Sequence, residues 1–408
     1  MLLQLLLVPL IASIVTCVSD EPHKPRIRGI TAFLRMELAN LHSRILEGVS
    51  FLRRANDLFQ NGGYDVQTLR ITTQPLVEYR QQISLRDLGS VLRTMDDLAD
   101  QHKLTISVGP AMQSDEDDPR IVDLLTEILA GSRHLAGSVR VADDSGVHLN
   151  AIEAAAKAIM YLSQNSPKGQ GNFSFAAIAM LPPYCPFFPG SYFDGAGNHF
   201  SVALESANVV LNSLRSSTSH ELQRVTLQKT FAGALTAVEK VANRVTDLTE
   251  WSFAGIDASP APGEQASIGS AIERLSGAPF GSSGTLSAVA LITNVVRNIP
   301  VDRVGYSGLM MPITEDHTLA KRWAEGRISI DALLAYSSVS GTGLDTIPLP
   351  GDISEMQVRN LVRDVATLAI TLRKPLSVRL LPVPGKRAGE STEFDDPRLV
   401  NTVLQRLP

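Results

Sequence analysis

The chain has 408 residues, of which 44% are hydrophobic and 19% are charged, and its formal net charge at pH 7 is −5. This length and composition are typical of a soluble globular protein with a sizeable core. The negative charge, with no cluster of Lys and Arg along the sequence, argues against a nucleic-acid-binding protein, because contacts to phosphates need such clusters.

The chain begins with a continuous apolar run, M-L-L-Q-L-L-L-V-P-L-I-A-S-I-V-T-C-V. This run suits a signal peptide and is short for a spanning helix, so we expect no stable membrane span. Ser19 and Cys17 satisfy the small-residue rule for cleavage, although no basic residue precedes the run. We therefore expect residues 1–19 to be a signal peptide and the protein to enter the secretory pathway or be secreted. A signal anchor and a mispredicted start on a cytoplasmic protein are the alternatives.

Cys17 and Cys185 are the two cysteines of the sequence. Cleavage of the leader would leave Cys185 alone, which excludes an intramolecular disulfide in the mature chain. The eight histidines show no spacing typical of metal ligands. The sequence therefore predicts no metal site, and no cofactor is evident from any motif.

Apolar runs alternate with stretches of helical period along the rest of the chain. Leu227, Phe231, Leu235 and Val238 are typical of the helical stretches, and a capping box at 354–357 begins another helix. The strands that the apolar runs predict lie, in chain order, at 27–34, 66–73, 104–108, 138–142, 174–180, 200–204, 254–257, 304–313, 339–347 and 376–381.

Strands that alternate with helices favour parallel βαβ units. No composition break or long linker divides the chain. We therefore expect a single α/β domain over residues 20–384, with a barrel or a large doubly wound sheet at its centre. Residues 385–408 are polar and are expected to be a tail on the surface.

The stretch A-G-I-D-A-S-P-A-P-G-E at 254–264 predicts a strand that ends in a loop with carboxylates, where α/β proteins usually bind ligands. Asp257 and Asp345 each come at or just after an apolar strand and are the candidate catalytic acids. Two such carboxylates could divide acid–base work or bind a divalent cation. Glu264, Glu315 and Asp316 are better explained as acids that offset a helix dipole.

An anion site is a second hypothesis. Arg70 lies within an apolar strand, and G-S-S-G-T at 281–285 precedes a helix, whose free amides attract phosphate or carboxylate. No P-loop lysine is present, and plain N-capping or tight turns would explain each loop alone. The candidate ligand-binding residues are Arg70, Ser145, Ser283, Gly284, Thr285, Ser307, Gly308 and Gly343.

Two further segments suggest alternatives. The aromatic, proline-rich loop from Tyr184 to Phe193 suits an apolar contact or a homodimer interface. Arg303-Val304-Gly305-Tyr306 is one residue short of the glycyl-radical signature R-V-x-G-Y and lies far from the C-terminus, and Cys185 would be its thiyl partner. An ordinary strand with a close-packed glycine explains the same residues.

Several blocks of the sequence together resemble a known family. They are L-R-I-T-T-Q-P, D-S-G-V-H-L-N, C-P-F-F-P-G-S-Y-F, F-A-G-I-D-A-S-P-A-P, G-S-S-G-T-L-S-A-V, Y-S-G-L-M-M-P-I-T-E-D and S-G-T-G-L-D-T-I-P-L-P-G-D. In order and spacing they resemble the uncharacterised group called domain of unknown function 711, from Ile27 to Pro384. The resemblance implies a ten-stranded barrel of two parallel five-stranded halves surrounded by helices, as in pyruvate formate-lyase. It implies no established activity.

The sequence thus leaves three functions open. The first is an enzyme that binds a small anionic metabolite in the barrel mouth, with Arg70 and the Ser/Gly/Thr loops on the anion and Asp257 or Asp345 as acid or base. The second is a non-catalytic barrel that binds a ligand or a partner. The third is a relative of the glycyl-radical enzymes.

Overall fold

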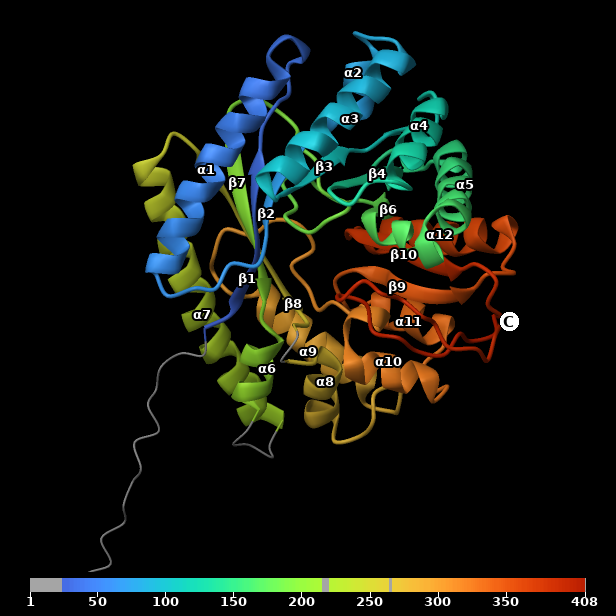
Figure 1. Cartoon of the computed structure of the whole chain (residues 1–408). Coiled ribbons are helices and arrows are strands. Elements are labelled where there is room, and N and C mark those ends of the chain that lie inside the picture. Colours follow the sequence, from blue (N-terminus) through green and yellow to red (C-terminus); the bar gives the residue numbers. More distant parts are fainter. Residues whose placement is uncertain (1–23, 215–219, 264–265, 408) are drawn as a thin grey trace, which may run out of the picture.

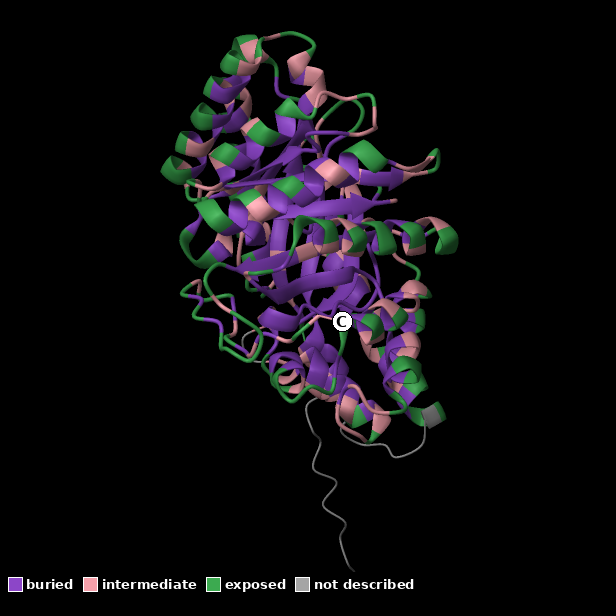
Figure 2. Ribbon diagram, turned by 90° about the vertical axis from the view of Figure 1, so that its right-hand side faces the viewer, coloured by how far each residue is buried: buried purple, intermediate pink, exposed green. Residues whose placement is uncertain are grey.

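The computed structural model of the chain describes residues 24–214, 220–263 and 266–407. Within these residues one ten-stranded mixed sheet forms the centre of the molecule, and helices pack around it (Figure 1). Figure 2 shows the strands buried and the outward faces of the helices exposed. The strands are β1 (Arg26–Phe33), β2 (Leu69–Pro75), β3 (Thr105–Gly109), β4 (Leu135–Asp143), β5 (Gly146–Val147), β6 (Phe175–Ala179), β7 (His199–Glu205), β8 (Ser252–Ala261), β9 (Gly343–Pro350) and β10 (Leu376–Val383).

The strands pair in the order β8-β7-β1-β2-β3-β4-β6-β10-β9, and β5 pairs with β4. Five of them, β1-β2-β3-β4-β6, form one parallel block. The parallel pairs β7–β8 and β9–β10 join this block antiparallel to β1 and β6. The α/β class is confirmed. A closed barrel with a second parallel half of five strands stays a prediction, because the strand pairing ends at β8 and β9.

The helices form because their apolar residues recur on the side that faces the sheet. In α7, for example, Leu227, Phe231, Leu235 and Val238 are all buried, as the sequence predicts. The helices are α1 (Leu41–Asn61), α2 (Leu76–Arg80), α3 (Leu85–His102), α4 (Arg120–Leu129), α5 (Leu149–Asn165), α6 (Ala207–Ser213), α7 (His220–Leu248), α8 (Ile268–Ser276), α9 (Thr285–Arg297), α10 (His317–Ala324), α11 (Ile330–Ser337) and α12 (Glu355–Leu372), with short 3-10 segments at η1 (Leu38–Asn40), η2 (Pro167–Ser174) and η3 (Ile313–Glu315).

The predicted strand at 304–313 is wrong. No strand lies within these residues, and the neighbouring Arg303 forms a single bridge to Ile256 of β8. Gly305 and Ser307 have positive φ angles of 65° and 41°, which break the extended conformation that a ladder requires. The segment is nevertheless held on both sides, because Val304 N–H donates to Ile256 O and Leu309 O accepts from Gly341 N–H ahead of β9.

Side chains alternate between the two faces of a strand. We call the face that points away from the helices the inner face of the sheet, and it carries polar residues. In β2, Ile71 packs against α1 at Gly48, whereas Arg70 points to the opposite side. The loop 181–193 lies against this polar face. Arg70 Nη1 donates to Pro186 O at 2.9 Å, and Ser107 Oγ donates to Ser191 O at 3.2 Å.

The same loop is mostly buried. Cys185 and Phe193 have 0% exposure and Tyr192 has 4%. The hydroxyls of the inner face hold the loop in place, so its aromatic residues fill the interior. An exposed apolar surface is thus limited to the partly buried Tyr184 and Phe188, and both the apolar contact and the homodimer interface at this loop stay predictions.

The ends of the chain bear on two other expectations. The candidate signal peptide at 1–19 and Glu264 lie outside the described residues, so both stay predictions. None of the helices in the described ranges is long and apolar enough to cross a membrane. The C-terminal tail is tied to the domain, since Phe394, Leu399 and Leu404 are buried and Ser391 pairs with Val403.

Candidate functional site

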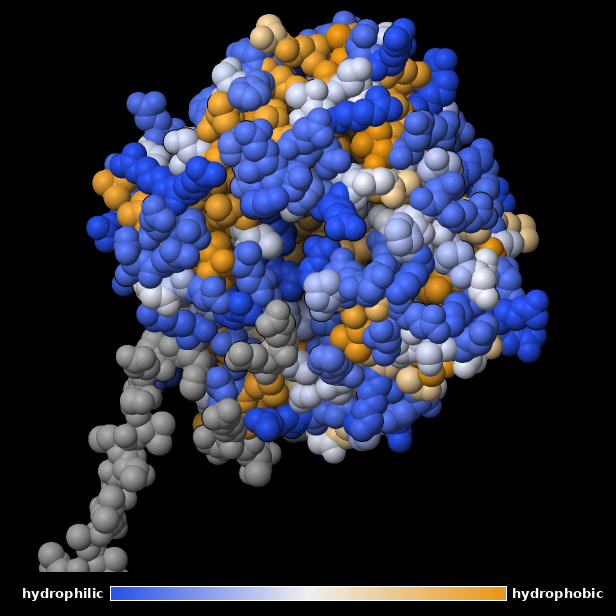
Figure 3. Space-filling view, in the orientation of Figure 1, coloured by the Kyte–Doolittle hydropathy of each residue, from blue (hydrophilic) through white to orange (hydrophobic). Residues whose placement is uncertain are grey.

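A cavity of about 740 Å³ opens beside the inner face of the sheet. Its size is within the range of small-molecule sites. Figure 3 shows hydrophilic residues around a hollow near the centre of one face of the molecule. Residues from β1, β2, β7, β9 and β10 line the cavity together with the segments before α8 and α10 and part of the C-terminal tail. Its charged residues are Arg26, Arg28, Asp65, Arg70, Glu205, Glu315, Asp316, Asp345, Arg379 and Arg398.

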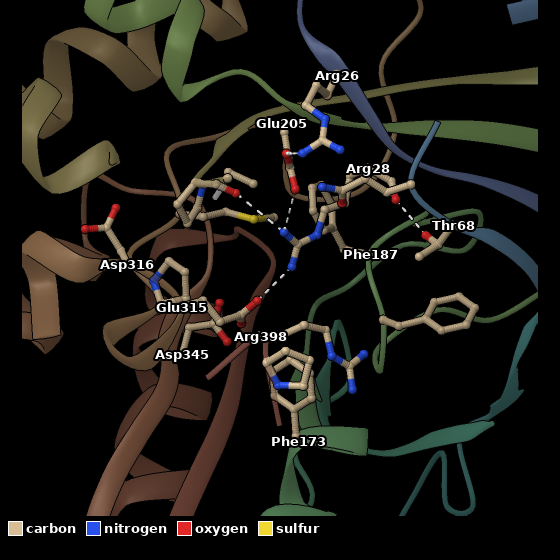
Figure 4. Close-up of a pocket in the computed structure, with 18 of the residues that line it drawn as sticks. Arg26, Arg28, Thr68, Phe173, Phe187, Glu205, Glu315, Asp316, Asp345 and Arg398 are labelled. Atoms are coloured by element: carbon tan, nitrogen blue, oxygen red, sulfur yellow. Dashed lines mark hydrogen bonds and ion pairs between the residues drawn. The ribbon is translucent and has the colours of Figure 1, made fainter. Parts of the chain in front are cut away.

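A chain of ion pairs crosses the cavity wall (Figure 4). Arg28 of β1 contacts Glu205 of β7 at 3.1 Å and Glu315 of η3 at 2.7 Å. Arg379 of β10 contacts Glu315 and Asp345 of β9, both at 2.6 Å. These five groups therefore join four strands and η3 through alternating charges.

The two acids that share Arg379 differ in their proton affinity. Burial raises the pKa of Asp345 above its ordinary value, and Arg379 offsets only part of that effect. Burial also disfavours the charged form of Glu315, but Arg379 and Arg28 together outweigh it and hold the pKa of Glu315 below its ordinary value. Neighbouring carboxylates whose pKa values move apart are suited to separate acid and base roles. Asp345 is thus the group that keeps a proton more readily.

Arg70 differs from the other arginines of the cavity because it has no acid partner among the described residues. Its Nε donates to Thr68 Oγ1 at 2.9 Å, and its guanidinium lies 4.9 Å from the centre of the Phe188 ring. Burial lowers the pKa of Arg70 to about 9, and the positive charges of Arg28 and Arg398 contribute. Arg70 remains charged at neutral pH, so the cavity holds a cation that no carboxylate in the described residues contacts.

Asp257 lies away from this cavity. It is 0% exposed within β8, which continues to Ala261 and does not end at Asp257 as the sequence predicts. Its Oδ2 accepts from Tyr306 N–H at 2.8 Å, and its Oδ1 accepts from Ser307 N–H and Ser259 N–H, both at 3.0 Å. Burial raises the pKa of Asp257 to about 6 against the effect of these hydrogen bonds. Asp257 therefore anchors the irregular segment 303–308, and its catalytic role stays a prediction.

Gly305 and Cys185 are neighbours, as the glycyl-radical hypothesis requires. A Cβ placed on Gly305 would lie 3.0 Å from Cys185 Sγ and would overlap Asp257 Oδ2. Burial raises the pKa of the Cys185 thiol well above its ordinary value, and the charge of Asp257 adds to the effect. Cys185 is 0% exposed and lines neither the large cavity nor the small one behind it. The pair is thus close together but sealed from the cavity.

The predicted Ser/Gly/Thr loops do not converge on the cavity. Ser145 is bonded to Asp143 on the exposed β4–β5 turn. Gly284 caps α9 and Thr285 Oγ1 accepts from Gly281 N–H, so the segment that includes Ser283 is a helix start. Ser307 lies beside Asp257, whereas Gly308 packs against Gly341 and Gly343 against Ser377. Of the predicted site residues, Arg70 and Asp345 line the cavity.

Three residues of the ion-pair chain, Arg28, Glu205 and Arg379, were missed by the sequence reasoning, and a fourth, Glu315, was assigned to a helix dipole. Arg28 and Arg379 show the signal that identifies Arg70, a charge within an apolar strand. Glu315 resembles a helix-start acid, but it is Asp316 that caps α10, accepting from Thr318 N–H and Leu319 N–H. Among the described residues, no group of three or more His, Cys, Asp or Glu is placed to hold a metal ion.

Comparison with known proteins gives the family but no activity. The chain is 31% identical over 355 residues to a UPF0210 protein of Pyrobaculum aerophilum, which covers 80% of this chain and 76% of that protein. It is 28% identical over 393 residues to a UPF0210 protein of Pyrobaculum islandicum, which covers 90% of this chain and 83% of that protein.

Among solved structures, the chain is similar to an anaerobic ribonucleotide reductase with a TM-score of 0.41 and 9% identity, over 86% of this chain and 70% of that one. A second match is the anaerobic ribonucleotide reductase of Thermotoga maritima, with a TM-score of 0.39, 9% identity and coverage of 86% and 75%. Residues 21–395 match the family described as Uncharacterised ACR, DUF711. The chain therefore belongs to the DUF711 family.

Proposed function

We propose that this protein is an enzyme that binds a small anionic metabolite in the cavity, with the anionic group on Arg70. The observation that carries the proposal is the missing counter-charge of Arg70. A buried guanidinium that no carboxylate contacts is costly, because burial disfavours its charge. A phosphate or carboxylate of a ligand would supply that counter-charge and accept the paired N–H donors of the guanidinium.

The acid–base group of the proposed enzyme is Asp345. It lines the cavity that Arg70 faces, and Arg379 holds its Oδ1 at 2.6 Å. Among the described residues its Oδ2 has no hydrogen-bond partner, so this oxygen is free to exchange a proton with a ligand. The higher proton affinity of Asp345 relative to Glu315 supports this role.

Sulfate binding tests the anion site, since sulfate keeps its charge over the pH range of folded proteins. Arg70→Met keeps the length of the side chain and removes its charge. We expect this variant to bind sulfate at least about tenfold more weakly by calorimetry. Arg120→Met is the matched control, because Arg120 pairs with Asp118 on the exposed start of α4. Equal sulfate affinity in the wild type and Arg70→Met would refute the assignment.

The same variants separate an enzyme from a non-catalytic ligand-binding protein. Turnover of a pool of phosphorylated and carboxylic metabolites is followed by mass spectrometry, with Asp345→Asn as the test variant. We expect Asp345→Asn to abolish turnover while sulfate binding persists. Binding in the wild type without turnover of any metabolite would favour the non-catalytic function.

Glycyl-radical chemistry is a second candidate, and the contact of Gly305 with Cys185 favours it. The sealed position of Cys185 weighs against it, because a substrate in the cavity would not meet the thiol. Anaerobic treatment with a radical-activating enzyme, followed by electron paramagnetic resonance and exposure to oxygen, decides the question. A glycyl signal with chain cleavage at Gly305 would support this function, and no signal would exclude it.

A further inference from the structure

A second, smaller cavity of about 30 Å³ lies behind Asp345. It has Phe187, Met310, Asp345 and Arg379 in common with the large cavity, so the two share a wall. A volume of this size holds about two water molecules or one small polar group. The inner cavity thus adjoins the large cavity at Asp345 and Arg379.

The wall of the inner cavity carries uncharged hydroxyl groups. Tyr306, Thr342 and Ser377 line it and are 6%, 2% and 6% exposed. Thr342 Oγ1 has no hydrogen-bond partner among the described residues. Ser377 Oγ donates to Thr342 O at 3.2 Å. A buried hydroxyl without a partner is costly, and because Thr342 lines a cavity, a polar group placed there would complete this wall.

The formal charges at the inner cavity are already paired. Arg379 is bonded to both Asp345 and Glu315, so it offers no free charge to a second anion. The group that fits here is therefore neutral and forms hydrogen bonds with Thr342 and Asp345. A hydroxyl group can both donate and accept such bonds, and a carbonyl oxygen accepts from Thr342 and from a protonated Asp345.

We propose that the inner cavity takes a hydroxyl or carbonyl group of the ligand whose anionic group lies on Arg70, so that the substrate is a small hydroxy acid or oxo acid. This inference rests on the proposed function. Arg70 selects the acid group, whereas Thr342, Tyr306 and Asp345 select the neutral polar group. The carboxyl of Asp345 lies between the two cavities and contacts the reacting end of the substrate.

Matched pairs of probes test the inference: glycolate with acetate, 3-hydroxypropanoate with propanoate, and 4-hydroxybutanoate with butanoate. The members of each pair have the same carboxylate and differ in one hydroxyl. We expect the pair whose length spans both cavities to show about tenfold tighter binding of the hydroxy acid, the effect of one hydrogen bond in a buried site.

Thr342→Val should remove that preference and leave the affinity for the acid without the hydroxyl unchanged. Tyr306→Phe should reduce the preference in the same way. Ser340→Ala is the matched control, because Ser340 Oγ is also buried without a partner among the described residues but lines neither cavity. It should leave the preference intact.

The outcomes separate the two proposals. If every pair binds equally and Arg70→Met weakens all probes, the inner subsite is refuted while the anion site stands. If the preference for the hydroxyl survives Thr342→Val and Tyr306→Phe, the subsite lies elsewhere and the inference is refuted. If no probe binds at all, both the proposed function and the inference fail.

Discussion

Gly305 lies directly against the side chain of Asp257 beside β8. Its φ of 65° is in the left-handed region, and a Cβ there would overlap Asp257 Oδ2. The carboxyl of Asp257 cannot move freely, because it is 0% exposed and accepts hydrogen bonds from Tyr306, Ser307 and Ser259. Gly305→Ala therefore perturbs both the backbone and the anchor of segment 303–308.

The expected loss of stability has two parts. The left-handed conformation of an alanine costs about 1–2 kcal/mol. Displacing the carboxyl breaks at least one of its hydrogen bonds, and a hydrogen bond to a charged group contributes about 1.5–3 kcal/mol. We therefore expect Gly305→Ala to lower the free energy of unfolding by about 3–5 kcal/mol.

Urea denaturation followed by the fluorescence of the buried Trp251 and Trp323 measures this loss. Gly277→Ala is the control, because Gly277 has a φ of 71° and a Cβ there would meet nothing within 4 Å. It should show only the backbone cost of about 1–2 kcal/mol. If Gly305→Ala is no less stable than Gly277→Ala, the contact with Asp257 does not hold the segment.

Three further predictions follow from the buried charged and thiol groups. Burial raises the pKa of Asp257 to about 6, so between about pH 4 and pH 6 the folded protein keeps this proton while the unfolded chain loses it. The contribution of Asp257 to the free energy of unfolding should therefore fall by roughly 3 kcal/mol as pH rises through that window. Asp257→Asn should flatten this part of the plot of unfolding free energy against pH. Glu315→Gln removes one carboxylate partner from both Arg28 and Arg379 and should lower the free energy of unfolding by about 3–5 kcal/mol. Glu221→Gln, in the exposed pair with Arg224, is the control and should leave the urea midpoint unchanged. Equal midpoints for the two variants would show that the ion-pair chain adds nothing to stability. In a Cys17→Ser background, iodoacetamide should label Cys185 only in urea, because the thiol is buried and burial raises its pKa, which disfavours the reactive thiolate. Rapid labelling of the folded protein would mean that the loop 181–193 opens readily.

Most of the sheet could be predicted because its helix-facing side chains form apolar runs. Nine of the ten predicted strands coincide with β1–β4 and β6–β10, and the two-residue β5 lies outside every predicted strand. The segment 304–313 is equally apolar, yet it is not a strand, because Gly305 and Ser307 turn the backbone toward Asp257. That turn depends on a side chain of another strand, which hydrophobic periodicity does not report.

A residue of the site could be predicted only where a charged side chain stands within an apolar stretch of the sequence. Arg70 was singled out because it is a charge within an apolar strand, and in the structure it lines the cavity. Ser283 and Gly284 follow a general pattern of helix starts, and the sequence does not tell whether such a start faces the cavity or the surface. Glu315 was assigned to a helix dipole because its partners, Arg28 and Arg379, are distant in sequence and meet it only in the folded sheet.

The balance of charge in the cavity links the proton of Asp345 to the proposed anion. The five arginines and the five acids that line the cavity carry equal and opposite charge when all are ionised. A proton on Asp345 leaves one positive charge in excess, which a bound monoanion on Arg70 would neutralise. Anion binding and protonation of Asp345 must then favour each other, because such coupling is reciprocal. Sulfate affinity should therefore fall as pH rises from acid to neutral, and Asp345→Asn should make it independent of pH. An affinity that is constant in the wild type would show that the two groups are not coupled across the cavity.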